Sequence, residues 1–363
     1  MDRKTIAFFG PANSGKSTLV NAIAGQQVSL VSPVPGTTTD PVRKLIELPG
    51  LGPCVLIDTA GLDDISTLGA ERRRLALAVL DETDVVVYVA AGQALPEIIR
   101  TAGIPVITYT RGETVESLLR RIATAIPEEE QRYLTGDLVR EGDTVLLVMP
   151  QDSEAPKGRL ILPQVQVIRE LLDRGCNPVC CTPDSMPAAL SALKDLPALT
   201  ITDASVFRAV NAVLPPEAPL TAFSVLLAAA KGDAEVFAKG AEVIDELKPG
   251  ARVLIAEACT HVPDTEDIGR VKIPALLRKR SGAQKSLTVD IAAGNDFPED
   301  LSRYDLIIHC GACTATRTLV RSRIKKALRN GVPITNYGIA LAKLQGMLGR
   351  IVIPGSRTRP RSS

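Results

Sequence analysis

A glycine-rich motif near the N-terminus constrains the fold of this chain more than any other feature. Residues 10–17 read Gly-Pro-Ala-Asn-Ser-Gly-Lys-Ser, between the apolar run Thr5–Phe9 and the amphipathic run Thr18–Ile23. This is the strand–loop–helix pattern of a P-loop, whose backbone N–H groups surround the phosphates of a nucleotide. The sequence therefore predicts an α/β domain with a parallel sheet and a nucleotide site after its first strand.

The residue types in the loop indicate separate roles in binding a nucleoside triphosphate. Lys16 is expected to reach the β- and γ-phosphates, and the Ser17 hydroxyl is expected to bind magnesium. The other predicted phosphate contacts in the loop and the first helical turn are Gly10, Asn13, Ser14, Gly15 and Thr18.

Two further segments stand in the order that a GTPase requires. The segment Pro-Gly-Thr-Thr-Thr-Asp resembles switch I, and Thr38 is the predicted magnesium ligand, with Thr37 beside it. An apolar strand then ends in Asp-Thr-Ala-Gly, the switch II pattern. Asp58 would contact magnesium through water, and the Gly61 amide would bind the γ-phosphate. The predicted catalytic residues are Lys16, Thr38, Asp58 and Gly61.

Two side chains near the phosphates bear on the rate of hydrolysis. Leu62 follows the switch II glycine and cannot position water as glutamine does in Ras-like proteins, so slow intrinsic hydrolysis is expected. Asn13 has two interpretations. Either the residue suits the turn, or its amide holds a potassium ion that neutralises developing charge, as in GTPases with a similar P-loop. The family resemblance described below favours potassium.

The guanine-recognition tetrapeptide N-K-x-D is absent from the sequence. One alignment places Thr110–Glu113 in its position. A second alignment, which we favour, takes Gly103–Thr110 and Val115–Leu119 as the last strand and helix of the domain, because Val85–Val89 lies only a short distance upstream. A whole strand–helix unit would then be missing, and weak guanine selectivity is expected.

Length and composition favour a cytosolic protein with several α/β domains. The 363 residues suffice for two or three domains, and strand-like runs alternate with helix-length segments throughout. The net charge of +1 and the aromatic content of 3% give no footprint for nucleic acid. No apolar run is long enough to cross a membrane, and the chain enters a strand at once, without room for a signal peptide.

Both histidines of the chain lie beside cysteines, in two clusters. Cys-Thr-His holds Cys259 and His261, and His-Cys-Gly-Ala-Cys holds His309, Cys310 and Cys313. Both clusters follow strand-like runs, at the edge where parallel sheets bind ligands. Thiolates and imidazoles at these spacings fit either a zinc ion or an iron–sulfur cluster, and the spacing alone does not choose between them.

The remaining cysteines are predicted to pack in hydrophobic cores. Cys54 lies in an apolar strand, and Cys176, Cys180 and Cys181 surround the predicted strand Pro178–Cys181. A secondary metal site at this group of three is the less favoured alternative.

Longer segments resemble the HydF family of GTPases and iron–sulfur scaffolds in FeFe-hydrogenase maturation. They are Ala155–Val165, Thr265–Pro274 and Pro333–Gly338. With the switch-type GTPase, C-x-H and H-C-x-x-C in this order, the similarity covers nearly the whole chain, except the missing N-K-x-D unit. The resemblance implies a GTPase domain, a dimerisation domain and a cluster-binding domain, at residues 1–130, 134–220 and 221–363.

The resemblance also implies cofactors and partners. Cys259, Cys310 and Cys313 would bind a 4Fe–4S cluster with one open iron, and His261 and His309 are candidates for its fourth ligand or for hydrogen bonds nearby. GTP, Mg²⁺ and K⁺ are the other implied cofactors. A cytoplasmic homodimer would accept a diiron precursor through the radical-SAM maturases HydE and HydG and deliver it to the FeFe-hydrogenase apo-enzyme, with GTP hydrolysis controlling partner binding. The alternative is a zinc-stabilised P-loop GTPase in RNA or ribosome assembly.

Overall fold

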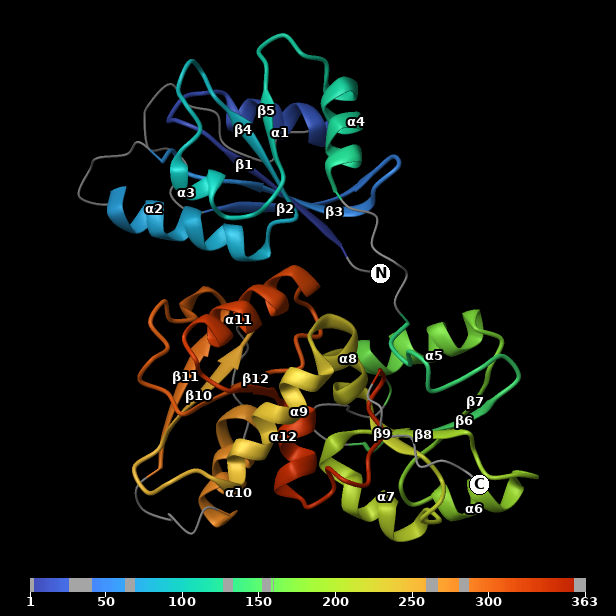
Figure 1. The fold of residues 1–363 in the computed structure, drawn as a ribbon. Coiled ribbons are helices and arrows are strands. Elements are labelled where there is room, and N and C mark those ends of the chain that lie inside the picture. The colour runs from blue at the N-terminus through green and yellow to red at the C-terminus, as the bar shows by residue number, and fades with distance from the viewer. Residues whose placement is uncertain are drawn as a thin grey trace. The chain divides into compact units, whose positions relative to one another are not determined.

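The structure is a computed structural model that describes residues 3–25, 41–62, 69–126, 133–151, 158, 160–258, 267–280 and 287–355. The chain divides into two compact units, one containing Met1–Glu130 and Thr316–Ser322 and the other containing Gln131–Ala315 and Arg323–Ser363 (Figure 1). Both units are α/β, which confirms the predicted fold class. Among the described residues, no helix is long and apolar enough to cross a membrane.

The first unit contains a five-stranded sheet in the order β2-β3-β1-β4-β5. Strand β2 runs antiparallel to β3, and the other neighbouring strands are parallel. The predicted parallel sheet is therefore present, with an antiparallel edge strand that was not predicted. Its elements are β1 (Lys4–Phe9), α1 (Lys16–Ala24), β2 (Val42–Leu48), β3 (Gly52–Asp58), α2 (Gly69–Ala78), β4 (Val85–Val89), α3 (Glu97–Arg100), β5 (Val106–Tyr109) and α4 (Val115–Ala125).

Strand β1 lies at the centre of this sheet and is buried on both faces. Ile6 and Phe8 pack into a hydrophobic cluster with side chains of α1 and α4. Ala7 and Phe9 point to the opposite face and pack into a second cluster with side chains of α2 and α3. Because both faces are covered, β1 is continuously apolar, and each phenylalanine side chain stabilises the fold by about 1.5–3 kcal/mol through burial.

The second unit contains two four-stranded sheets in which all neighbouring strands are parallel. The first has the order β7-β6-β8-β9 and is built from β6 (Thr144–Val148), α5 (Leu162–Asp173), β7 (Asn177–Cys181), α6 (Met186–Ala192), β8 (Leu199–Thr202), α7 (Phe207–Val213), β9 (Leu220–Ala222) and α8 (Phe223–Lys231). The second has the order β11-β10-β12-β13 and is built from α9 (Ala234–Glu242), β10 (Arg252–Glu257), α10 (Ile273–Arg280), β11 (Thr288–Ala293), β12 (Leu306–His309), α11 (Arg317–Arg329), β13 (Ile334–Asn336) and α12 (Tyr337–Leu344).

The predicted domain boundary at residue 220 falls at the start of β9. This strand pairs with β8 and so completes the sheet of the preceding residues. The proline-rich segment before it forms a turn, in which the Ala218 amide donates to the Pro215 carbonyl oxygen at 3.1 Å. A division after α8 therefore fits the two sheets better than a division at residue 220.

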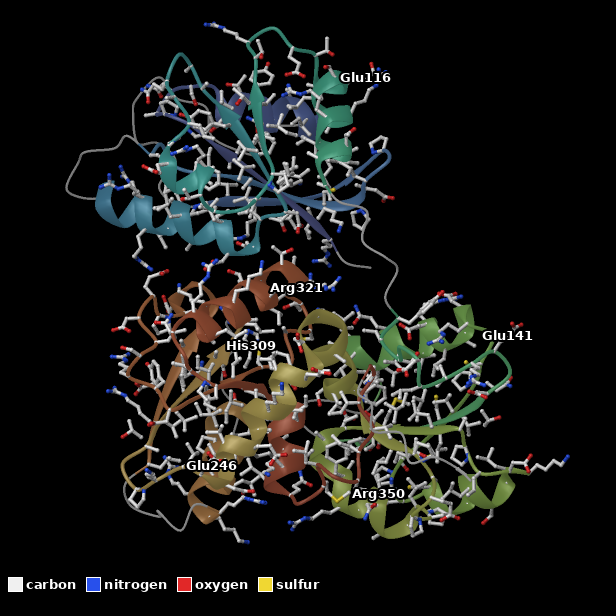
Figure 2. The ribbon with its side chains drawn as sticks, viewed as in Figure 1. Glu116, Glu141, Glu246, His309, Arg321 and Arg350 are labelled. Atoms are coloured by element: carbon white, nitrogen blue, oxygen red, sulfur yellow. The ribbon has the colours of Figure 1, made fainter. Side chains whose placement is uncertain are left out.

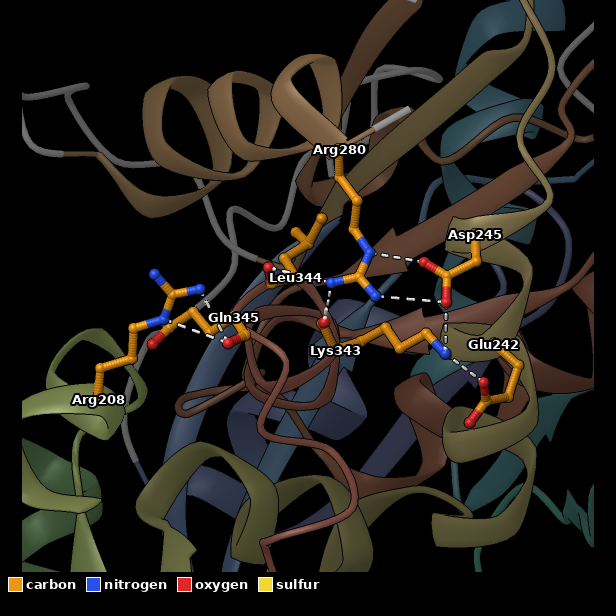
Figure 3. A network of polar contacts seen from close by, with 7 residues as sticks. All are labelled: Arg208, Glu242, Asp245, Arg280, Lys343, Leu344 and Gln345. Carbon is orange, nitrogen blue, oxygen red and sulfur yellow. Dashed lines mark hydrogen bonds and ion pairs between the residues drawn. The ribbon is translucent and has the colours of Figure 1, made fainter. Parts of the chain in front are cut away.

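A polar network joins the two halves of the second unit (Figure 3). Arg208 of α7 donates to the carbonyl oxygen of Gln345 at 3.0 Å. Asp245 accepts from Arg280 of α10 at 2.6 Å and lies 2.9 Å from the Lys343 ammonium of α12. Hydrogen bonds from Arg280 and Lys343 lower the pKa of Asp245. The network thus links α10 to α12 directly and through Asp245, and it links α7 to Gln345, which follows α12.

Candidate nucleotide and metal sites

The loop after β1 has a backbone suited to phosphate binding. A Cβ atom at Gly10 would lie 2.3 Å from the Val89 carbonyl oxygen, so only glycine fits where the loop passes β4. Asn13, with φ 57°, adopts the left-handed conformation that asparagine tolerates better than most residues. Turns of this kind point successive N–H groups toward a bound anion.

The side chains predicted to act on phosphate and magnesium lie together at this loop. The Lys16 ammonium donates to the carbonyl oxygens of Gly10 and Pro11 at 3.2 and 2.6 Å. The Ser17 hydroxyl donates to Asp58 Oδ2 at 2.5 Å, and Asp58 is completely buried at the end of β3. A P-loop hydroxyl beside a switch II carboxylate is the arrangement that holds Mg²⁺ in P-loop NTPases.

The end of β3 is attached to β1 by hydrogen bonds. The Thr59 hydroxyl donates to the Phe8 carbonyl oxygen at 2.7 Å. Leu62 packs against the hydrophobic cluster that contains Phe9, so its side chain is occupied in packing. Gly61 lies in the chain between Thr59 and Leu62, the two residues that make these contacts. The predictions for Thr37 and Thr38 fall outside the described residues.

The segment around β5 distinguishes the two alignments of the guanine-recognition region. Between β4 and β5, residues 90–105 contain the short helix α3 and no strand. The Glu113 carboxylate, which one alignment offers for guanine, forms an ion pair with Arg121 at 2.9 Å and accepts from the Ser117 hydroxyl at 3.0 Å. Its position is therefore set by contacts with α4, which favours the second alignment.

The second candidate site lies at the carboxyl ends of the adjacent parallel strands β10 and β12. The Cys310 amide donates to the Ala256 carbonyl oxygen at 2.8 Å. The Cys310 sulfur accepts from the backbone N–H groups of Ala258 and Ala312 at 3.1 and 3.4 Å. Hydrogen bonds from N–H groups to sulfur stabilise a thiolate relative to the thiol, because they favour the charged form. The backbone of Ala258, the residue before Cys259, thus contacts the Cys310 sulfur.

Only part of the predicted ligand set falls within the described residues. His309, Cys310 and Cys313 are described, whereas Cys259 and His261 are not. Within the described part of the chain, no three His, Cys, Asp or Glu side chains gather as a metal site would require. The convergence of the two clusters therefore stays a prediction, to which the contact between Ala258 and Cys310 adds support.

His309 ends β12 and is buried in the second unit (Figure 2). Its Nδ1 lies 2.8 Å from the Cys310 carbonyl oxygen, and its Nε2 lies 3.2 Å from the Arg323 guanidinium. Burial, together with the charge of Arg323, lowers the pKa of His309 to about 3. A neutral ring with a proton on Nδ1 satisfies both contacts, so both ring nitrogens have protein partners.

Sequence reasoning missed Arg323, a buried residue that joins the carboxyl ends of three strands. Besides contacting His309, its guanidinium donates to the carbonyl oxygens of Glu257 and Gly294 at 3.1 and 2.5 Å. Glu257 ends β10, Gly294 follows β11 and His309 ends β12. No sequence pattern marks Arg323 for this role, because it lies within a helix that carries many basic residues.

Sequence reasoning also missed a contribution from β13. Asn336 donates through Nδ2 to the Cys310 carbonyl oxygen at 3.2 Å and accepts from the Gly338 amide at 2.8 Å. Burial raises the pKa of the Tyr337 phenol, and the nearby Cys310 sulfur raises it further. The signal was available, since Asn336 and Tyr337 follow an apolar run at the same sheet edge as the cysteine clusters.

The other cysteines divide between core and surface. Cys54 and Cys176 are buried in hydrophobic clusters of the first and second unit, in agreement with their predicted packing. Cys180 is exposed and Cys181 is half-buried, so the prediction of core packing is wrong for Cys180. The strand β7 lies at a sheet edge, where alternate side chains point away from the core.

The sequence matches three family profiles. They are described as 50S ribosome-binding GTPase over residues 5–119, Hydrogen maturase F dimerization domain over residues 134–232 and Hydrogen maturase F tetramerization domain over residues 235–354. The first profile covers the P-loop and switch II, and the third covers the described cysteine cluster. Where a cluster-binding domain was predicted, the matching profile is thus named for tetramerization.

Curated GTPases match part of this chain. The tRNA modification GTPase MnmE of Thermus thermophilus is 44% identical over 88 residues, 23% of this chain and 19% of that protein. GTPase Der of Wolinella succinogenes is 40% identical over 95 residues, 26% of this chain and 20% of that protein. The chain spans about a fifth of the length of these relatives. A solved structure of Era from Aquifex aeolicus bound to GDP.AlF4- is 17% identical, covering 82% of this chain and 97% of that chain with a TM-score of 0.26.

Proposed function

The chain belongs to the hydrogen maturase F family, and from that assignment we propose that it is a GTPase and 4Fe–4S scaffold in FeFe-hydrogenase maturation. The two profiles of this family span most of residues 134–354, outside the GTPase region. The P-loop, the buried Asp58 and the GTPase profile support nucleotide hydrolysis with Mg²⁺.

The observation that carries the cluster proposal is the environment of the Cys310 sulfur. Two backbone N–H groups donate to it, and one of them belongs to the residue before Cys259. Hydrogen bonds to sulfur are one of the means by which proteins tune iron–sulfur clusters, so the donor set fits this group. Cys259, Cys310 and Cys313 would be the three thiolate ligands, and when bound the cluster supplies one iron open to exchange.

We assign His309 to hydrogen bonding behind the ligand, and not to the open iron. Its ring nitrogens face the Cys310 carbonyl oxygen and Arg323, which leaves no lone pair directed at a metal. His261 is then the remaining histidine candidate for the fourth ligand of the cluster or for hydrogen bonds to it.

The proposed cargo is a diiron precursor carrying CO and cyanide. The radical-SAM maturases HydE and HydG would supply it, and the FeFe-hydrogenase apo-enzyme would receive it, in the cytoplasm where thiols stay reduced. GTP hydrolysis would control these encounters through the switches. The family descriptions support a homo-oligomer formed through residues 134–232 and 235–354, and we place the domain division after α8.

Metal content after anaerobic purification tests the proposal. We expect a brown protein with about four iron atoms per chain and little zinc, as a single 4Fe–4S cluster requires. A colourless protein with one zinc per chain would instead support the alternative, a zinc-stabilised GTPase in RNA or ribosome assembly. The hydrogen maturase F profiles outside the GTPase region weigh against that alternative.

Weak guanine selectivity is expected of the nucleotide site. Residues 90–105 contain no strand, and the Glu113 carboxylate is engaged by Arg121, so neither alignment supplies the base contacts of N-K-x-D. Competition of GTP, ATP and ITP for a fluorescent nucleotide should give similar inhibition constants. Tight and strongly GTP-selective binding would mean that another element supplies guanine recognition.

We expect the side chain of Asn13 to make the hydrolysis rate depend on potassium. The variant Asn13→Gly keeps the left-handed backbone, since glycine adopts φ 57° without strain, but it removes the side-chain amide. We expect wild-type hydrolysis to be faster in KCl than in NaCl, and the variant to lose this difference while keeping its rate in NaCl. Equal potassium stimulation of both proteins would show that asparagine serves the turn alone.

A further inference from the structure

A lysine at the end of α8 contacts the loop that carries the cysteines. Lys231 Nζ donates to the carbonyl oxygens of Ala312, Cys313 and Ala315 at 2.7, 3.1 and 2.9 Å. A lysine ammonium is a compact cation with three N–H donors, so it matches three converging carbonyl oxygens. These contacts bring a positive charge to the backbone of one of the predicted ligands.

The contacted loop has a backbone that needs such support. It connects β12 to α11, and Ala312 within it adopts φ 50°, a left-handed conformation that residues with a Cβ atom seldom occupy. The amide of Ala312 donates to the Cys310 sulfur, while its carbonyl oxygen accepts from Lys231. The rare conformation therefore points the N–H group at the ligand sulfur, and the ammonium holds the adjoining carbonyl groups in place.

Lys231 and the cysteine loop match different domain profiles of the family. Lys231 lies within residues 134–232, which match the dimerization profile, whereas the loop lies within residues 235–354. Both belong to one compact unit of the structure. The cysteine loop is thus positioned partly by a residue outside the region that contains the cysteines.

We propose that Lys231 is a positioning residue of the cluster site. It fixes the loop so that Cys310 and Cys313 present their thiolates together, and it supplies a positive charge beside them. This inference rests on the proposed function for the nature of the cluster. A 4Fe–4S cluster held by three thiolates is anionic and becomes more so on reduction, so a nearby cation raises its reduction potential.

The test compares Lys231→Met with Lys231→Arg and with the control Lys239→Met, which makes the same change at an exposed lysine of the neighbouring helix α9. In the apo-protein, alkylation of Cys313 by iodoacetamide is followed by mass spectrometry. In the reconstituted protein, iron content and the midpoint reduction potential are measured. Circular dichroism and thermal unfolding report on the fold of each variant.

The expected results separate positioning from general stability. In Lys231→Met, iodoacetamide should alkylate Cys313 several-fold faster than in the wild type, and the cluster should be reduced at a more negative potential. Lys231→Arg should recover most of the wild-type potential, and Lys239→Met should match the wild type in both measurements. Unchanged alkylation and potential in Lys231→Met would overturn the inference. A wild-type protein that takes up no iron–sulfur cluster would instead overturn the proposed function. The alkylation rates of the apo-proteins would still show whether Lys231 positions the cysteine loop.

A folding defect in Lys231→Met would shift the test to the wild-type protein. An amine-reactive acetyl ester should modify Lys231 much more slowly than Lys239, because the three hydrogen bonds must open before the amine can react. Equal rates at the two lysines would contradict the inference.

Discussion

Cys310→Ala is expected to abolish the iron–sulfur cluster and to leave GTP hydrolysis nearly unchanged. The sulfur of Cys310 accepts hydrogen bonds from the backbone N–H groups of Ala258 and Ala312. Its removal therefore deletes a predicted cluster ligand and the hydrogen-bond acceptor of both amides. Iron and sulfide content after anaerobic reconstitution, with GTP turnover on the same sample, measure the two effects. The unpaired amides should also lower the free energy of unfolding by about 1–3 kcal/mol.

Cys180→Ala is the matched control, because it removes an exposed thiol from the same unit. It should retain the full iron content and the wild-type rate of hydrolysis. Simultaneous loss of cluster and hydrolysis in Cys310→Ala would show that the nucleotide site depends on the cluster site. Full iron content in that variant would remove Cys310 from the ligand set.

Lys16→Met is expected to produce the reciprocal result, with hydrolysis lost and the cluster retained. The ammonium is held at the P-loop by the carbonyl oxygens of Gly10 and Pro11, where it would meet the β- and γ-phosphates. Deleting a preorganised group that stabilises developing charge costs about 10²–10³-fold in kcat. Steady-state phosphate release, with nucleotide affinity measured separately, would quantify this loss.

Lys44→Met provides the comparison, since it makes the same substitution on β2 of the same unit. Its hydrolysis rate should stay within about twofold of the wild type, as expected for a residue outside the predicted phosphate and magnesium contacts. A normal rate in Lys16→Met would exclude the P-loop as the hydrolytic site. Loss of iron in Lys16→Met would mean that nucleotide binding and cluster retention are coupled.

The central strands β1 and β4 were readable from the sequence because their buried residues form apolar runs. The predicted strand Val85–Val89 matches β4 at both ends, and the apolar run Thr5–Phe9 lies within β1. Strands buried on both faces need uninterrupted apolar residues, so the pattern is local and strong. The P-loop was equally clear, because its glycines and Lys16 serve a backbone geometry that few other sequences form.

The edge strands β2, β9 and β11 could not be read in the same way. Strand β2 exposes every second side chain but has no polar/apolar alternation in its sequence, β9 has three residues, and β11 contains an aspartate. Edge strands obtain their conformation from hydrogen bonds to a neighbouring strand, which local composition does not encode. The boundary at residue 220 was placed without this information, because only the pairing of β9 with β8 assigns that strand to the middle sheet.

The sequence by itself determined the fold class, the phosphate-binding loop and the two Cys/His clusters, because each depends on residues close together in the chain. The tertiary structure decided which distant groups surround Cys310. Arg323, Asn336 and Lys231 come from three different helices or strands and meet the cysteine loop only when the parallel strands align. Hydrogen bonds of this kind depend on position to within a few tenths of an ångström, which sequence spacing does not specify.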